Sequence, residues 1–304
     1  MKNTKIALAI IITILALNSK AQNQKPNIIL ILADDIGYKS LTCNGGNLYA
    51  TPNIDELAQK GMRFTQCHAS PSCSPSRHSL LTGKYNFRNY VEWGKMDIDQ
   101  KTIGNMMKDA GYKTACFGKW QLGGGNQSIQ TFGFDSYAVH DAFNMTQMKS
   151  RYKNPHIYTH GAFLPDSLTL NKYGPDIVSD SLLDFIDNNK SNPFFIYYPV
   201  ILCHGPFQPT PDDPEFAAWK HGDDTSFYSS MIKYMDKLVG KTISKIKEKG
   251  IENNTIIIFV GDNGTSDHIA EYADGDSVSL GGKWSTTEAG THVPMIAYWP
   301  GNCK

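Results

Sequence analysis

The chain has 304 residues, which allows one large domain or two ordinary domains with a sizeable core. It carries 29 basic and 29 acidic residues, so its formal net charge is zero at pH 7. The balanced charge and the lack of a basic stripe argue against nucleic-acid binding, and the sequence has no internal repeat or low-complexity tract.

The first residues are typical of an export signal. Lys2 and Lys5 precede an apolar run from Ile6 to Leu17, and a small-x-small cleavage site follows over residues 19–21. The sequence therefore predicts a signal peptide at residues 1–21 and a mature chain that is periplasmic or secreted. The apolar run is too short to span a membrane, and no other long apolar run occurs. The six cysteines show no paired zinc spacing, and we predict no disulfide.

The first buried strand is expected over 27–33, where a continuous apolar run suits a parallel sheet. Asp34 and Asp35 follow it directly, at the end of a strand where open α/β sheets bind ligands. Two adjacent carboxylates are costly unless a cation compensates them, and oxygen ligands suit Ca²⁺ or Mg²⁺. The alternative is a loop with two solvated acids. A helix over 51–61 and a strand over 62–69 come next.

A proline-rich stretch then leads into a helix that ends at Gly83. Pro75 suits the first helical position, because its missing N–H costs nothing there. Cys73 would lie just ahead of the helix N-terminus, which favours an anionic nucleophile or a bound anion. Arg77 comes round to the same side, where its guanidinium would hold a phosphate or sulfate group. The alternative is a buried, inert cysteine in a turn.

A helix over 102–110 and a short strand over 112–118 precede Lys119. This lysine would hold an anionic oxygen at the strand end, or it is a surface lysine. The segment 124–174 has no regular pattern, and we expect it to be irregular and to shape substrate specificity.

The next predicted pair is an amphipathic helix over 175–189 and a strong strand over 194–198. His204 follows this strand. Its imidazole has a suitable pKa for proton transfer, although a structural role is the alternative for a lone histidine.

A long helix over 226–249 and a buried strand over 255–260 lead to a second polar strand end. Asp262 and Asn263 stand there and would complete a metal site with the two acids after the first strand. A type I′ turn at Asn263-Gly264 is the alternative. A last strand is expected over 294–299.

Together these motifs resemble the type I sulfatases, although the histidine that this family has at position 121 is Gln121 here. The matching segments are Asp34-Asp35-Ile36-Gly37, Cys73-Ser74-Pro75-Ser76-Arg77, Leu81-Thr82-Gly83, Gly118-Lys119-Trp120-Gln121-Leu122-Gly123, His204-Gly205-Pro206, Asp262-Asn263-Gly264 and Gly282-Lys283.

The resemblance implies an α/β fold similar to alkaline phosphatase, with a mostly parallel central sheet flanked by helices. Residues 22–304 would be the N-terminal catalytic domain, without the smaller C-terminal subdomain of the family. The implied activity is hydrolysis of a sulfate ester by a formylglycine that a maturation enzyme makes from Cys73. A Ca²⁺ ion, in preference to Mg²⁺, would be bound by Asp34, Asp35, Cys73, Asp262 and Asn263. The residues expected to act on or bind the sulfate are Cys73, Arg77, Lys119, Gln121, His204 and Lys283.

Two alternatives to a sulfatase stay open for the function. A glutamine can donate and accept hydrogen bonds but cannot act as a base near neutral pH, so Gln121 bears on sulfate release. The chain would be a sulfatase acting on a sulfated small molecule or glycan, a phosphate or phosphonate ester hydrolase of the same fold, or a catalytically impaired protein that binds sulfated glycans.

Overall fold

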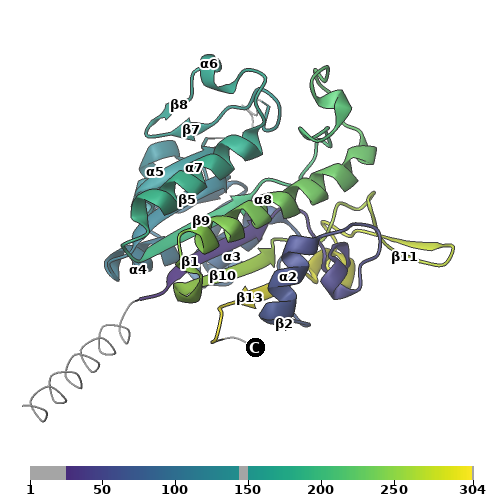
Figure 1. Ribbon diagram of the computed structural model, residues 1–304, viewed down its shortest axis with the longest axis horizontal. Coiled ribbons are helices and arrows are strands. Elements are labelled where there is room, and N and C mark those ends of the chain that lie inside the picture. The colour runs from purple at the N-terminus through teal and green to yellow at the C-terminus, as the bar shows by residue number, and fades with distance from the viewer. Residues whose placement is uncertain (1–24, 144–149, 303–304) are drawn as a thin grey trace, which may run out of the picture.

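The computed structural model describes residues 25–143 and 150–302, which fold around a central sheet (Figure 1). The predicted signal peptide lies outside these residues. Within them the main sheet has nine strands in the order β2-β13-β10-β1-β9-β5-β6-β7-β8. The strands are β1 (Asn27–Ala33), β2 (Met62–Phe64), β5 (Lys113–Lys119), β6 (Ser136–His140), β7 (Tyr158–Thr159), β8 (Ala162–Phe163), β9 (Phe194–Val200), β10 (Thr255–Gly261) and β13 (Met295–Tyr298).

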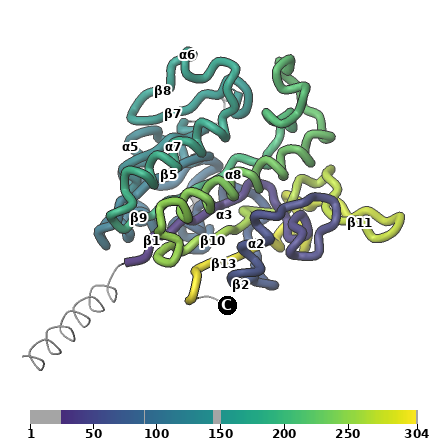
Figure 2. Tube along the Cα trace, in the orientation of Figure 1, coloured from purple at the N-terminus to yellow at the C-terminus, as the bar shows by residue number. Residues whose placement is uncertain are grey.

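The middle of the sheet is parallel. Strand β1 pairs in parallel with β10 and β9, and β5 pairs in parallel with β9 and β6. The outer strands β13, β2, β7 and β8 are antiparallel. Figure 2 shows the purple β1 between β9 and β10, which come much later in the chain. The predicted α/β fold with a central sheet flanked by helices is confirmed, and the parallel pairing is confined to the five strands in the middle of the sheet.

Helices cover both faces of the sheet because its central strands are apolar on both sides. In β1, Ile29 and Ile31 belong to one core cluster, whereas Leu30 and Leu32 belong to the other. The first cluster includes residues of α2, α7 and α8, and the second includes residues of α3, α4 and α5. Helices α7 and α8 cross the same face of the sheet in Figure 1. The helices are α2 (Pro52–Lys60), α3 (Cys73–Thr82), α4 (Ile103–Asp109), α5 (Gly125–Thr131), α6 (Asp166–Thr169), α7 (Gly174–Asn189), α8 (Tyr228–Glu248) and α9 (Glu288–Thr291).

Two hairpins lie outside the main sheet. One is β3 (Tyr90–Glu92) with β4 (Lys95–Met96), and the other is β11 (Ala270–Asp274) with β12 (Ser277–Leu280). The described cysteines, Cys43, Cys67, Cys73, Cys116 and Cys203, are free thiols. In the part of the chain that the structure describes, no helix has the length and apolar character needed to cross a bilayer.

The structure differs from the sequence-based expectation in two places that concern the site. The segment 124–174 is not irregular throughout, because its described part contains α5, β6, β7, β8 and α6. These elements are too short to show a period, and β6 is defined by its pairing with β5. Helix α3 begins at Cys73 instead of Pro75. Pro75 is tolerated as its third residue because the first four N–H groups of a helix have no intrahelical partner.

Candidate functional site

Four polar residues meet at the carboxyl ends of β1 and β10. Because Ala33 lies opposite Gly261 in the parallel ladder, the residues that follow each strand come out side by side. The Asp35 backbone N–H donates to Asp262 Oδ1 at 3.1 Å, and Asn263 Nδ2 donates to Asp35 Oδ1 at 2.8 Å. Asp34, Asp35, Asp262 and Asn263 are all buried. The structure therefore brings together the four predicted oxygen ligands.

This cluster has the donor set that a hard cation requires. Carboxylate oxygens of Asp34, Asp35 and Asp262 lie within 4.8 Å of one another. Asp34 Oδ1 and Asn263 Oδ1 are buried oxygen atoms without a hydrogen-bond partner, which is costly for acceptors in the interior. Several converging oxygen donors with lone pairs left over fit Ca²⁺ or Mg²⁺.

Three cationic side chains face the acids. Arg77 Nη2 lies 2.8 Å from Asp262 Oδ2, and Lys119 Nζ lies 2.6 Å from Asp34 Oδ2. Lys283 Nζ lies 2.7 Å from Asp35 Oδ2.

All three of these side chains are buried, so the cations and carboxylates compensate one another in an environment of low polarity. Burial would raise the pKa of Asp34, but Lys119, His204 and Arg77 hold the pKa of this carboxyl below its usual range.

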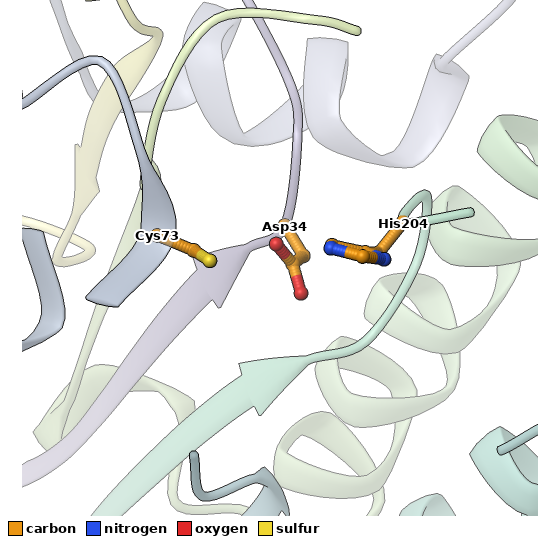
Figure 3. Close-up of side chains that lie close together, drawn as sticks. All are labelled: Asp34, Cys73 and His204. Atoms are coloured by element: carbon orange, nitrogen blue, oxygen red, sulfur yellow. The ribbon is translucent and has the colours of Figure 1, made fainter. Parts of the chain in front are cut away.

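Cys73 lies at the first position of α3, one turn before Arg77. Its side chain is buried, and its Sγ lies within 4.8 Å of a carboxylate oxygen of Asp34 and of a ring nitrogen of His204. Figure 3 shows the Cys73 sulfur and the His204 ring on opposite sides of the Asp34 carboxylate. The sequence predicts an anionic nucleophile or a bound anion at this helix N-terminus, and the unmodified thiol does not fit the first of these. Burial outweighs Lys119 and raises the pKa of Cys73 above its ordinary value.

His204 lies in the loop after β9 and faces the acids. Its Nε2 is 3.9 Å from Asp35 Oδ2, and its Nδ1 is 2.6 Å from the carbonyl oxygen of Gly205. Burial, together with the positive charge of Lys119, lowers the pKa of His204 to about 4. The imidazole therefore sits beside the buried charges in its neutral form near pH 7.

Gln121 occupies the turn that follows β5, two residues after Lys119. Its side chain is buried, and its backbone has a left-handed φ of 54°. The Gln121 N–H donates to the carbonyl oxygen of Asp141 at 3.2 Å. This backbone bond ties the turn to the residue after β6.

Sequence reasoning missed one buried cation of the site. Arg151 Nη1 lies 3.1 Å from His204 Nδ1, and Arg151 Nη2 lies 2.9 Å from Asp141 Oδ2. Arg151 comes from the segment 124–174, where no periodic pattern or motif indicates which side chain turns inward. The segment therefore reaches the site at this residue, and its predicted role in substrate specificity stays a prediction.

The loop that follows Asp34 and Asp35 rests on Glu271 of β11. Glu271 Oε1 accepts from the Lys39 N–H at 2.9 Å. A Cβ at Gly37 would lie 2.3 Å from the same carboxylate oxygen, so a larger residue there would require the Glu271 carboxylate to move. Burial raises the pKa of Glu271 to about 7, although the Lys39 N–H opposes the shift.

Glu271→Gln is expected to flatten the pH dependence of stability. In the unfolded chain a glutamate has a pKa of about 4.3. Between that value and 7 the folded chain binds the extra proton, so the free energy of unfolding falls as the pH rises toward 7. From pH 5 to pH 8 the variant should gain about 2 to 3 kcal/mol relative to the wild-type chain. Urea denaturation at both pH values measures this, with the exposed Glu215→Gln as control. A difference that does not change with pH would contradict the prediction.

Comparisons with known proteins add three findings. A family model described as Sulfatase matches residues 26–304. The chain is 31% identical over 334 residues to Arylsulfatase G of Mus musculus, covering 94% of this chain and 62% of that protein. It is 30% identical over 360 residues to the N-acetylgalactosamine-6-O-sulfatase of Bacteroides thetaiotaomicron, covering 93% of this chain and 69% of that protein. The chain thus spans about 62% of the length of the Arylsulfatase G relatives.

Solved structures share the fold. The crystal structure of Ps i-CgsB superimposes with a TM-score of 0.78 at 30% identity, covering 92% of this chain and 67% of that chain. The phosphonate monoester hydrolase of Agrobacterium radiobacter has a TM-score of 0.61 at 18% identity, which is a likeness of fold alone.

Proposed function

Because the chain belongs to the sulfatase family, we propose that it hydrolyses a sulfate ester with a formylglycine made from Cys73 and a bound Ca²⁺ ion. One observation carries this proposal. Arg77, Lys119 and Lys283 converge, buried, on the strand-end acids beside residue 73. A tetrahedral sulfate ester, whose negative charge is spread over three terminal oxygens, suits three converging cations better than a single carboxylate does.

The cation would be held by the oxygen atoms of Asp34, Asp35, Asp262 and Asn263, with the modified residue 73 beside them. When bound, it would supply positive charge that polarises the sulfate ester. The formylglycine would supply, in its hydrated form, a hydroxyl group that attacks sulfur. A separate maturation enzyme would have to make this group from the cysteine.

The remaining work falls to the side chains of this chain. Helix α3 fixes residue 73 and Arg77 one turn apart, so the attacking group and a sulfate-binding guanidinium keep a constant separation. Lys119 and Lys283 would bind sulfate oxygens and offset the charge that builds up as the ester bond breaks. His204 is neutral in the free site, so the negative charge of the bound ester would have to raise its pKa before Nε2, which faces the acids, could give a proton to the departing alcohol; the Lys283 ammonium is the other donor within the site.

The observation at Gln121 supports a second candidate function. At this position the resemblance implies a histidine that helps to release sulfate, and a glutamine cannot take up the proton. The chain would then bind sulfated glycans through the same cations without turnover. A phosphate or phosphonate ester hydrolase is the other candidate, and only the fold supports it.

Matched aryl esters separate these candidates. The full chain, made in a host that contains the maturation enzyme, should hydrolyse an aryl sulfate faster than the corresponding aryl phosphate by about 100-fold or more. The tryptic peptide of residues 64–77 should carry the mass of formylglycine at position 73. Faster hydrolysis of the phosphate would contradict the proposal. Glycan binding without turnover of either ester, in protein that carries the modification, would favour the binding protein.

A further inference from the structure

Two tryptophans lie together beside the anion-binding side chains. Trp284 directly follows Lys283, and 61% of its surface is exposed. Trp93 connects the strands of the β3–β4 hairpin and is half-buried. The two ring centroids are 5.3 Å apart, with an angle of 33° between the ring planes. The pair is thus formed by two segments that are far apart in the sequence and meet at these rings.

The backbone ties both segments to the residues around Cys73. The Trp284 N–H donates to the carbonyl oxygen of Pro71 at 2.7 Å, two residues before the cysteine. The Gly94 N–H donates to Ser74 Oγ at 2.9 Å, one residue after it. The aromatic pair therefore keeps its position relative to the start of α3.

Trp284 adds little to the stability of the folded chain. Its φ is 76°, in the left-handed region that bulky residues rarely adopt. Its large ring also stays mostly in water, so folding gains little from burying it. A strained, exposed tryptophan of this kind is typical of a binding position, where a ligand covers the ring.

The distance between this ring and the anion site fits one molecule that occupies both. Lys283 Nζ lies 2.7 Å from Asp35 Oδ2 and 5.5 Å from the centroid of the Trp284 ring. A sulfate ester held by Lys283 would therefore place the carbon skeleton of its alcohol beside the Trp284 ring.

The surroundings of the pair favour a ring with polar edges. Glu92 and Lys95, on either side of Trp93 in the hairpin, are exposed and form an ion pair of 3.1 Å. The hydroxyl groups of Ser285 and Thr287 follow Trp284 and bond to each other. A pyranose ring has an apolar C–H face for stacking and hydroxyl groups around its edge for such partners, whereas a plain aryl ring has only the face.

We propose that Trp284 and Trp93 form an aromatic platform that stacks on the pyranose ring carrying the sulfate ester. This proposal depends on the proposed function, and it narrows the substrate to a sulfated carbohydrate. It would orient the sugar while the cations hold the sulfate, so Trp284 and Trp93 are binding residues and take no part in proton transfer.

Binding without turnover tests the platform. The probes are N-acetylgalactosamine 6-sulfate, galactose 6-sulfate, phenyl sulfate and inorganic sulfate, titrated by calorimetry in Ca²⁺ buffer into the full chain with Cys73→Ala. In this background, Trp284→Ala should weaken binding of the tighter sulfated sugar by about 10-fold and leave inorganic sulfate unchanged. Trp284→Gly, which relieves the positive φ, should behave like Trp284→Ala, and Trp284→Phe should retain most of the affinity. Phe163→Ala, at a half-exposed aromatic residue of β8, is the control.

Each of the other outcomes contradicts the proposed function, the platform, or the assignment to a pyranose. If inorganic sulfate does not bind, the proposed function fails and the platform with it. If sulfate binds but neither sugar binds more tightly than sulfate, or if Trp284→Ala and Trp284→Gly change no affinity, the platform alone is wrong. If phenyl sulfate loses as much affinity as the sugar, the pair accepts any ring and the assignment to a pyranose is wrong.

Discussion

Replacing Cys73 by alanine is expected to lower the rate of aryl sulfate hydrolysis by about 10⁴-fold or more. Alanine lacks the thiol through which the maturation enzyme would oxidise Cβ to an aldehyde, so the variant cannot form the nucleophile. The substitution leaves Arg77, Lys119 and Lys283 in place. Sulfate binding should therefore persist while the chemical step is lost, which separates a missing nucleophile from a collapsed site.

The measurement needs a control for folding and for cysteine loss in general. Cys67→Ala removes a half-buried thiol on the segment that leads to the site, where its Sγ lies 3.8 Å from Met295 Sδ. This variant should keep the wild-type rate, and both variants should melt within a few degrees of the wild-type chain. A Cys73→Ala protein that hydrolyses the ester at the wild-type rate would contradict the proposed nucleophile.

The sheet could be predicted because its central strands carry a strong local signal. The apolar run 27–33 coincides with β1, and 255–260 lies within β10, because strands buried on both faces need apolar residues at every position. The strands at the edges of the sheet were harder to predict from the sequence. The expected strand 62–69 is regular only over Met62–Phe64, where it pairs with β13. Pairing at an edge depends on a distant partner, so the residues of one segment do not define it.

The strand-end side chains of the site could be predicted for a related reason. Parallel strands bring their carboxyl ends to one edge, so acids after the strands at 27–33 and 255–260 were expected to converge, and they do because β1 and β10 are neighbours. Arg151, Trp93 and Glu271 could not be found in the same way. They come from a loop and from the two hairpins outside the main sheet, and only tertiary contacts bring them to the site. Side chains that line a site from loops carry no period in the sequence.

The pairing within the site has a consequence for ligand binding. Each cation that we propose to bind sulfate now contacts a carboxylate that the proposed metal ion would use. Lys119 contacts Asp34, and Lys283 contacts Asp35, at 2.6 and 2.7 Å. An arriving sulfate must compete with these carboxylates for the same ammonium groups. An arriving divalent cation must compete with the ammonium groups for the same carboxylates. A bound metal ion therefore frees the ammonium groups for sulfate, and a bound sulfate frees the carboxylates for the metal ion.

Ca²⁺ and inorganic sulfate are accordingly expected to bind with positive coupling. Removing Ca²⁺ with a chelator should weaken sulfate binding by about 5- to 150-fold, and sulfate should tighten Ca²⁺ binding by the same factor, because the coupling free energy is reciprocal. Calorimetric titration of each ligand in the absence and presence of the other measures both factors without any turnover. Asp35→Asn, which removes the charge that faces Lys283, should reduce the coupling, whereas Asp212→Asn at an exposed ion pair with Lys237 should leave it intact. Equal sulfate affinity with and without Ca²⁺ would mean that the ion and the sulfate do not share these partners, and the proposed metal site would be wrong.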